Sequence, residues 1–408
     1  MRERVDYARS GDREPDAPES RPRVNHRVYY DEGVGTGPFA VDRYFGGAFG
    51  LGLDRNIREA YRFLSQMYEP GDEIYVFGFS RGAFTARSLV GYVAASGLLQ
   101  RHRCSRSRER QAWRYYRTPP KARYPAIRAD LDRDVHQDLR VKCLGVFDTV
   151  GALGIPLTGL NTFNRWRYQF HDTALGSIVD NAFQALALDE PRWPFRPSVW
   201  TRPTHNRFKR VEQAWFAGGH SDVGGGNVYN GEQAAAQPLS SIALDWMIRR
   251  VEATSGLRFA EPAWVLDPLA DQHEAFKFPY RLFGRTVRVV NKTPPATTRA
   301  FRLATIPAHL SPIGEVLHVS VLQRLGRDVI LNGSKVLYAP ANVLALVEIV
   351  EASYRARGGP AEPQPSMKIV DWDGGVLDPA DEGSAETVLA LLRNVRARLG
   401  EHRLLGRP

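Results

Sequence analysis

Short apolar runs alternate with amphipathic stretches along most of the chain. Residues 74–79 form an apolar run that predicts a strand, and residues 81–98 then place apolar side chains at helical spacing up to a glycine stop. An earlier stretch predicts another helix through apolar residues at helical spacing, namely Ile57, Ala60, Tyr61, Leu64 and Met67. This alternation is typical of an α/β fold with a mostly parallel sheet and helices on both faces.

Later strands end in glycine and polar residues. The runs at residues 139–154 and 211–227 are buried strands by pattern, and each finishes in a loop that carries Asp or His. Amphipathic helices are predicted at residues 238–256 and 385–401, and a short strand at residues 26–30. Since ligands of open α/β sheets bind at the carboxyl ends of the strands, the chemistry is expected there.

Ser80 lies at the junction of the first predicted strand and helix, within Gly78-Phe79-Ser80-Arg81-Gly82. In this context the pattern indicates a nucleophile elbow, a sharp turn that presents the serine oxygen outside the chain. The backbone N–H of Arg81 would then donate to the oxyanion, and the glycines would let strand and helix approach. The competing interpretation is a structural turn without catalysis.

A serine of this kind is followed along the chain by an acid and then a histidine. Asp148 and Asp222 each follow a predicted strand; we favour Asp222 because its flanking glycines leave the carboxylate uncrowded, while Asp148 could cap a loop. For the base we favour His318, which follows the last α/β unit, over His220, which would share a strand face with Asp222.

A metal site is the second interpretation of these strand ends. Asp31, Asp148, His220 and Asp222 could converge on an ion, but none of them belongs to a His-Glu-x-x-His or Asp-x-Asp pattern. No metal or cofactor is therefore expected. Only Cys104 and Cys143 are present, which argues against a disulfide framework or a cysteine-built zinc site.

Length and composition fit a folded enzyme. With 408 residues and 43% hydrophobic content the chain can bury a sizeable core. No apolar run approaches the roughly 18 residues that span a bilayer, and the first residues lack the apolar region of a signal peptide. We expect a protein that is cytoplasmic as synthesised, with any export by a non-classical route.

The net charge of +10 is carried mostly by arginine. The densest basic run, residues 101–123, has interleaved aromatics and could face phosphates or a membrane, although a solvated surface helix is favoured and nucleic-acid binding is disfavoured. We expect a charged, disordered leader at residues 1–25, a hydrolase-like domain at 26–330 and a C-terminal extension or helical cap at 331–408. The sequence does not predict an oligomeric state.

Seven segments between residues 28 and 325 together resemble one family, the catalytic domain of type VI secretion phospholipase effectors. They are "VYYDEGVGTG", "GGAFGLGLDRNIREAYRFL", "YEPGDEIYVFGFSRGAFTARSLVGYV", "GVFDTVGALGIP", "ALALDEPRWPF", "AWFAGGHSDVGGG" and "LHVSVLQRL". The resemblance implies an α/β-hydrolase fold with Ser80 as nucleophile and Asp222 and His318 completing the triad. It also implies hydrolysis of carboxylic esters, which in some members are phospholipids.

One departure from the family pattern concerns the N-terminus. Relatives carry an Asp-Gly-Thr strand and a helix ahead of the segment matched by "VYYDEGVGTG", and here the charged leader occupies that place. An oxyanion donor would come from that missing unit. The leading hypothesis is a lipase-like or phospholipase-like serine hydrolase acting on an ester substrate, with transient membrane contact. The alternative is a truncated, catalytically lapsed fold that binds an anionic surface or partner.

Overall fold

The computed structural model describes residues 25–31, 49–150, 178–201, 210–226, 238–260, 264–277, 280–293, 302–304, 312–357 and 366–404. The chain divides into two units, residues 1–30 and 31–408. Of the first unit, residues 25–30 are described; they are exposed and form no strand, so the strand predicted at 26–30 is wrong. The predicted leader, apart from residue 25, and the glycine-rich loop at 32–37 lie outside the described residues.

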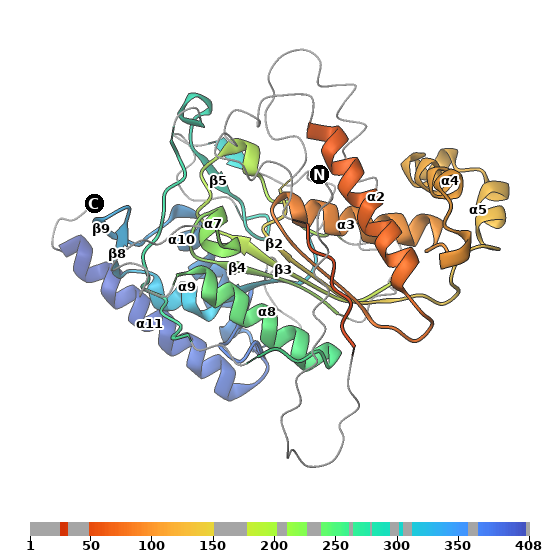
Figure 1. Ribbon diagram of the computed structural model, residues 1–408. Coiled ribbons are helices and arrows are strands. Elements are labelled where there is room, and N and C mark those ends of the chain that lie inside the picture. The colour runs from red at the N-terminus through yellow and green to blue at the C-terminus, as the bar shows by residue number, and fades with distance from the viewer. Residues whose placement is uncertain are drawn as a thin grey trace, which may run out of the picture. The chain divides into compact units, whose positions relative to one another are not determined.

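A seven-stranded, mostly parallel sheet organises the second unit (Figure 1). Its strands, in spatial order, are β1 (Ile74–Phe79), β2 (Val141–Phe147), β3 (Val179–Ala187), β4 (Arg210–Phe216), β7 (Glu315–His318), β10 (Lys368–Val370) and β11 (Val376–Leu377). Every neighbouring pair is parallel except β10 and β11, which are antiparallel. The predicted α/β class with a mostly parallel sheet is confirmed.

The register of the first four strands brings their carboxyl ends to one edge. Phe79 at the end of β1 pairs with Phe147 at the end of β2, and Phe147 pairs with Ala185 near the end of β3. Ala187 in turn pairs with Phe216 at the end of β4. The residues that follow these strands therefore emerge side by side, which is the usual location of a ligand site in such sheets.

Helices cover both faces of the sheet. The main ones are α2 (Phe49–Met67), α3 (Arg81–Ser96), α8 (Ser240–Ser255), α10 (Ala341–Arg355) and α11 (Glu382–Leu404). Alternate residues of β2 enter different clusters: Leu144 and Val146 pack with α2 and α3, whereas Cys143 packs with α8. Apolar side chains are therefore buried under helices on both faces of the sheet, as expected for a mostly parallel sheet.

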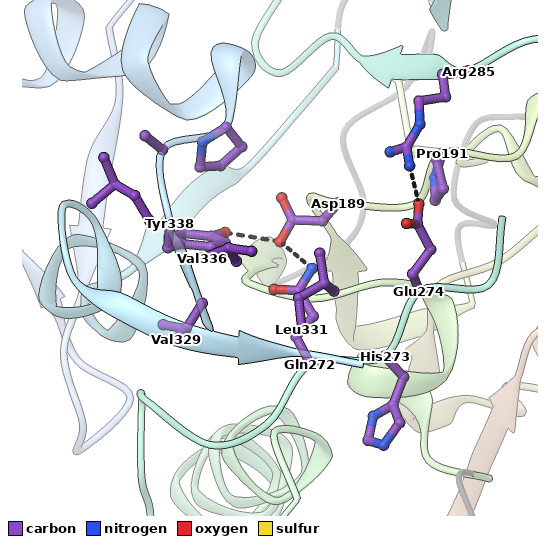
Figure 2. A pocket seen from close by; sticks show the side chains of 13 residues that line it. Asp189, Pro191, Gln272, His273, Glu274, Arg285, Val329, Leu331, Val336 and Tyr338 are labelled. Carbon is purple, nitrogen blue, oxygen red and sulfur yellow. Dashed lines mark hydrogen bonds and ion pairs between the residues drawn. The ribbon is translucent and has the colours of Figure 1, made fainter. Parts of the chain in front are cut away.

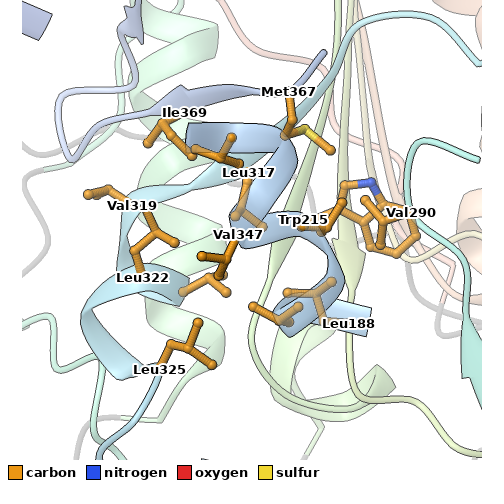
Figure 3. Close-up of a cluster of buried hydrophobic side chains, with 14 of the residues drawn as sticks. Leu188, Trp215, Val290, Leu317, Val319, Leu322, Leu325, Val347, Met367 and Ile369 are labelled. Carbon is orange, nitrogen blue, oxygen red and sulfur yellow. The ribbon is translucent and has the colours of Figure 1, made fainter. Parts of the chain in front are cut away.

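A third apolar cluster lies where α9 (Val319–Arg324), α10 and α11 meet β4, β7 and β10 (Figure 3). Trp215 of β4 and Leu317 of β7 contribute to it from the sheet, and Val347 of α10 and Leu322 of α9 from the helices. Burial of this apolar surface holds the C-terminal helices to the sheet. Beyond residue 330, β10 and β11 thus extend the seven-stranded sheet, and α10 and α11 pack against it.

Shorter elements complete the described fold. They are η1 (Arg101–Arg103), α4 (Arg106–Arg117), η2 (Pro120–Ala122), α5 (Pro125–Leu131), η3 (Trp193–Phe195), α7 (His220–Gly224), η5 (Tyr280–Phe283), β5 (Thr286–Arg288), β6 (Arg302–Ala304), α9 (Val319–Arg324), β8 (Asp328–Leu331) and β9 (Ser334–Leu337). In the basic run, α4 buries Trp113 and leaves Arg110 and Arg114 exposed, the pattern of a surface helix.

The strand β3 was not among the predicted strands. Its nine residues are all buried, yet three of them, Asp180, Asn181 and Gln184, are polar. Each has a partner: Arg140 lies 2.6 Å from the Asp180 carboxylate, Asn181 donates to a backbone carbonyl, and Gln184 accepts from Thr149 at 2.6 Å. Tertiary hydrogen bonds thus compensate for a low strand propensity.

The two glycines of the Ser80 motif allow a matched test of packing. A Cβ on Gly78 would lie 2.4 Å from the carbonyl oxygen of Gly82, whereas a Cβ on Gly82 would meet no atom beyond its own helix. We expect Gly78→Ala to lower the free energy of unfolding by about 1–3 kcal/mol or more, because backbone must move. Gly82→Ala should be neutral or slightly stabilising, because alanine has the higher helix propensity. Urea denaturation measures both; equal losses would contradict the packing account.

Candidate active site

The turn at Ser80 has strained backbone geometry. Its φ of 57° and ψ of −116° lie in a region that residues other than glycine rarely adopt. The Ser80 N–H donates to the Phe147 carbonyl at 3.0 Å, and the Ser80 carbonyl accepts from the Phe84 N–H at 3.2 Å as α3 begins. Strand pairing and helix initiation therefore hold the strained residue in place, which is a common feature of functional sites.

A continuous hydrogen-bonded chain runs from this serine to a buried carboxylate. His220 Nε2 lies 2.7 Å from Ser80 Oγ, and His220 Nδ1 lies 2.6 Å from Asp148 Oδ2. Asp148 has no exposed surface and His220 is 4% exposed, whereas Ser80 is partly exposed. The structure thus brings Ser80 together with His220 and Asp148, the two residues that the sequence offered as alternatives.

Several contacts fix the His220 ring. His220 is the first residue of α7, and its backbone N–H donates to Glu190 Oε2 at 3.1 Å. The ring packs against Phe79, with centroids 4.6 Å apart, and against Phe195 at 5.0 Å. Phe79 fits because residue 224 is glycine; a Cβ there would lie 2.0 Å from the Phe79 ring. The imidazole is therefore packed against two aromatic rings, and both of its nitrogens have hydrogen-bond partners.

Asp148 follows β2 with a positive φ of 39° and accepts hydrogen bonds on both carboxylate oxygens. Oδ1 accepts from the Ala187 N–H at 3.1 Å, and the Arg288 guanidinium donates to Oδ1 at 2.5 Å and to Oδ2 at 2.9 Å. Burial alone would raise the pKa of Asp148, but attraction to Arg288 and the hydrogen bond from His220 outweigh it and lower that pKa well below its ordinary value. The carboxylate is therefore ionised at neutral pH.

Asp222, the acid favoured from the sequence, has other partners. Residues 220–224 form a helix, not a strand end, and side chains two apart on a helix point to different sides. Asp222 Oδ2 accepts from the Gly219 N–H at 2.9 Å, and Asp222 Oδ1 lies 3.0 Å from His273 Nδ1. Contrary to the expectation from the sequence, Asp222 is not the acid bonded to the histidine beside Ser80. Asp222 stabilises the start of α7 and contacts His273.

His318, the base favoured from the sequence, is a core residue. It ends β7 and caps α9, where its Nδ1 accepts from the Ser320 N–H at 3.3 Å and lies 2.8 Å from Ser320 Oγ. The ring stacks on Phe216 with centroids 4.8 Å apart and meets Trp372 edge-on. Burial lowers the pKa of His318 to about 3, so it is neutral. The imidazole at Ser80 Oγ is that of His220, which corrects the expected geometry.

Arg288 is the residue of this site that sequence reasoning missed. It lies on the short strand β5, and one arginine in a chain with 55 basic residues gives no pattern that singles it out.

A metal site is the second interpretation that the sequence offers for these strand ends. Within the described residues, no group of three or more His, Cys, Asp or Glu side chains is placed to hold an ion. Asp148 and His220 instead bond to each other.

A separate cavity of about 260 Å³ lies between residues 189–191, 272–274 and 329–340 (Figure 2). Asp189 lines it, and its Oδ2 accepts from the Tyr338 hydroxyl at 2.9 Å and from Gln272 at 3.3 Å. Glu274 and Arg285 form an ion pair of 2.6 Å on another side of it. Burial raises the pKa of Asp189 to about 6. None of the residues that line this cavity belongs to the Ser80–His220–Asp148 chain.

The parallel sheet, the elbow and the hydrogen-bonded serine together define a hydrolase-like fold of the α/β class. The model of the family "T6SS, Phospholipase effector Tle1-like, catalytic domain" matches residues 9–250, more than half of the chain. The chain therefore belongs to this family of phospholipase-type hydrolase domains. In the described residues, no helix is both long and apolar enough to cross a bilayer.

Individual relatives share part of their length with this chain. An uncharacterized protein of Saccharomyces cerevisiae, YEL023C, is 34% identical over 162 residues, which are 38% of this chain and 22% of the relative. A crystal structure of an uncharacterized protein from Pseudomonas aeruginosa matches at 23% identity and a TM-score of 0.30, covering 53% of this chain and 29% of the other. The structure of the Tle1 effector bound to the VgrG spike from the type 6 secretion system matches at 22% identity and a TM-score of 0.26, covering 46% and 32%.

The chain thus spans between about a fifth and a third of the length of these relatives. Family membership rests on the match to residues 9–250.

The buried His318 should make stability depend on pH in a defined window. Because burial lowers its pKa from 6.5 to about 3, the unfolded chain binds a proton between these pH values that the folded chain does not. The stability it contributes is present above about pH 6.5 and lost as the pH falls toward 3. We expect His318→Asn, which keeps a capping side chain but cannot titrate, to flatten this acid loss by a few kcal/mol.

Urea midpoints measured from pH 8 to pH 4 check this prediction. The exposed His102 offers a matched control, and His102→Asn should keep the wild-type pH dependence. The quantity compared is the change of the urea midpoint with pH, so a loss of stability that is the same at every pH does not affect the comparison. The same pH dependence in wild type and His318→Asn would contradict the prediction.

Proposed function

We propose that this domain is a serine-dependent carboxylic ester hydrolase, lipase-like or phospholipase-like, with Ser80 as nucleophile, His220 as general base and Asp148 as the orienting acid. One observation carries the proposal: the hydrogen-bonded chain of 2.7 Å and 2.6 Å that joins these three side chains. The order serine, acid, histidine along the sequence agrees with α/β-hydrolases. These roles replace the assignment of Asp222 and His318 made from sequence.

The chemistry follows from this geometry. His220 Nε2 takes the hydroxyl proton as Ser80 Oγ attacks the ester carbonyl, and the imidazolium returns that proton to the departing alkoxide, leaving an acyl-enzyme. Water then attacks the acyl-enzyme by the same proton transfers, which releases the carboxylic acid and restores the Ser80 hydroxyl. Asp148, ionised and bonded to Nδ1, keeps the proton of neutral His220 on that nitrogen and stabilises the imidazolium.

The oxyanion is assigned to the start of α3. Arg81 is the first residue of that helix and directly follows Ser80, the position whose backbone N–H donates to the oxyanion in a nucleophile elbow. Such donors, together with the positive end of the helix dipole, stabilise the negative charge that develops on the carbonyl oxygen. The backbone N–H of Arg81 is therefore the proposed first oxyanion donor.

The family supports a phospholipid ester as substrate, and with it transient contact with a membrane surface and export by a secretion system. The alternative is a lapsed hydrolase fold that binds an anionic surface or partner. Retention of the buried Asp148–His220 pair beside a partly exposed Ser80 favours the enzyme, because a fold kept for binding alone has no use for this arrangement.

Covalent labelling tests the nucleophile and the base. We expect a fluorophosphonate probe to label the wild-type protein, and Ser80→Ala to abolish labelling. Turnover of a short-chain p-nitrophenyl ester should fall by about 10⁴-fold or more in Ser80→Ala and in His220→Asn, since serine and histidine act as a unit. His318→Asn, assayed where it is folded by circular dichroism, should label like wild type.

Loss of activity in His318→Asn with retention in His220→Asn would overturn the assignment of the base. A wild-type protein that neither labels nor cleaves short-chain esters or phospholipids in mixed micelles, but binds anionic liposomes in a salt-sensitive way, would support the lapsed fold instead. The two results use the same purified protein.

The acid is tested by a second matched pair. We expect Asp148→Asn to lower kcat by about 10⁴-fold, because the amide favours the wrong histidine tautomer. Asp222→Asn should keep kcat within about tenfold of wild type, since its contacts lie at Gly219 and His273. Steady-state kinetics with the same ester measures both variants. The reverse ranking would restore Asp222 as the acid.

A further inference from the structure

The Arg288 guanidinium is 1% exposed and reaches three separate parts of the site. Beyond its two bonds to Asp148, Nη1 donates to the Ala187 carbonyl at 2.7 Å, and Nη2 donates to the Phe195 carbonyl at 2.5 Å. Asp148 follows β2, Ala187 ends β3, and Phe195 belongs to η3 and packs on the His220 ring. One side chain therefore ties the acid to two neighbouring segments.

We propose that Arg288 is a positioning residue of the hydrolytic site, acting through Asp148 to set the orientation and charge of the Asp148–His220 pair. This inference rests on the proposed function, in which Asp148 orients His220. Arg288 touches neither Ser80 nor any atom that reacts.

The first part of the inference concerns geometry. The two carboxylate oxygens of Asp148 together accept four hydrogen bonds: one from Ala187, one from His220 and two from Arg288. A two-pronged guanidinium contact fixes the plane of a carboxylate, which a single ammonium contact does not. With that plane fixed, Oδ2 faces His220 Nδ1 and cannot rotate away.

The second part concerns charge. An ionised Asp148 without a counter-charge would favour a proton on His220, and Arg288 offsets that attraction. Among the described residues, Glu190 also lies near the ring: it accepts the His220 backbone N–H and is bound by Arg192 at 2.7 Å. Asp222, which lies on α7 together with His220, pairs with His273. Arg288 is thus the counter-charge in direct contact with the Asp148 carboxylate that faces His220.

The position of Arg288 is itself held by the C-terminal half of the chain. It ends β5, and its carbonyl accepts from Asn342 Nδ2 at 3.3 Å; the same amide donates to the Leu188 carbonyl at 3.0 Å. Asn342 lies in the first turn of α10. Arg288 lies outside residues 9–250, which match the family model. Residues beyond that match therefore complete the proposed site.

The test compares Arg288→Met and Arg288→Lys with wild type in the full-length chain. We expect Arg288→Met to lower kcat for a short-chain ester by about 100-fold with KM within about twofold. The acid limb of the kcat/KM profile should move to higher pH by about one unit, because the Asp148–His220 pair then holds its proton more tightly. Arg288→Lys, which keeps the charge but not the fork, should lose rate with a smaller move of the limb.

Arg250 gives the matched control. It forms the same kind of buried fork, to Glu212 at 2.8 Å and 2.6 Å, on α8. Arg250→Lys should keep the wild-type acid limb and the wild-type kcat per labelled site. Titration with the fluorophosphonate probe counts active sites, so rates are compared per active molecule.

Two failures are distinguishable. A wild type without labelling or turnover would remove the proposed function and this inference with it. An active wild type, with Arg288→Met showing an unmoved acid limb and unchanged kcat per active site, would overturn the role of Arg288 alone. A fall only in the number of active molecules, with the limb unmoved, would likewise reduce Arg288 to a stabilising residue.

Discussion

The pairing of one buried carboxylate with one buried guanidinium is the interaction on which the rest of the site depends. Asp148 has no exposed surface, and an unpaired charge in such a place is strongly unfavourable. Arg288 supplies the opposite charge, and backbone groups satisfy most of the remaining hydrogen-bonding capacity of the pair. The ionised state of Asp148 and the orientation of His220 beside Ser80 both depend on this neutralised pair.

Close backbone packing sets the other half of the site. The elbow requires Gly78, whose missing Cβ leaves room for the carbonyl of Gly82, and α7 requires Gly224, whose missing Cβ leaves room for Phe79. Phe79 connects the two, because it ends β1 and packs against His220. The packing of Phe79 of β1 against α7 therefore helps to set the distance between Ser80 Oγ and His220 Nε2.

Local pattern was enough to predict the sheet class and the elbow. The strand at 74–79 has the predicted bounds, and its helix ends at Ser96 within two residues of the prediction, because apolar spacing and glycine stops are local signals. The partners of Ser80 could not be ranked in this way. Whether residues 220–222 are a strand end or a helix changes which side chains share a face, and the sequence Gly-Gly-His-Ser-Asp does not decide that. Arg288 carries no local signal because its role exists only after β5 has docked.

The four residues of the site come from well-separated points of the chain, Ser80, Asp148, His220 and Arg288. Each contact between them closes a loop of many residues, so the entropy cost of the site is met only when the strands between them have paired. During synthesis, which proceeds from the N-terminus, the serine leaves the ribosome long before the arginine that neutralises its acid. A nascent chain therefore carries an incomplete site, and the proposed hydrolytic activity would arise as one of the last events of folding.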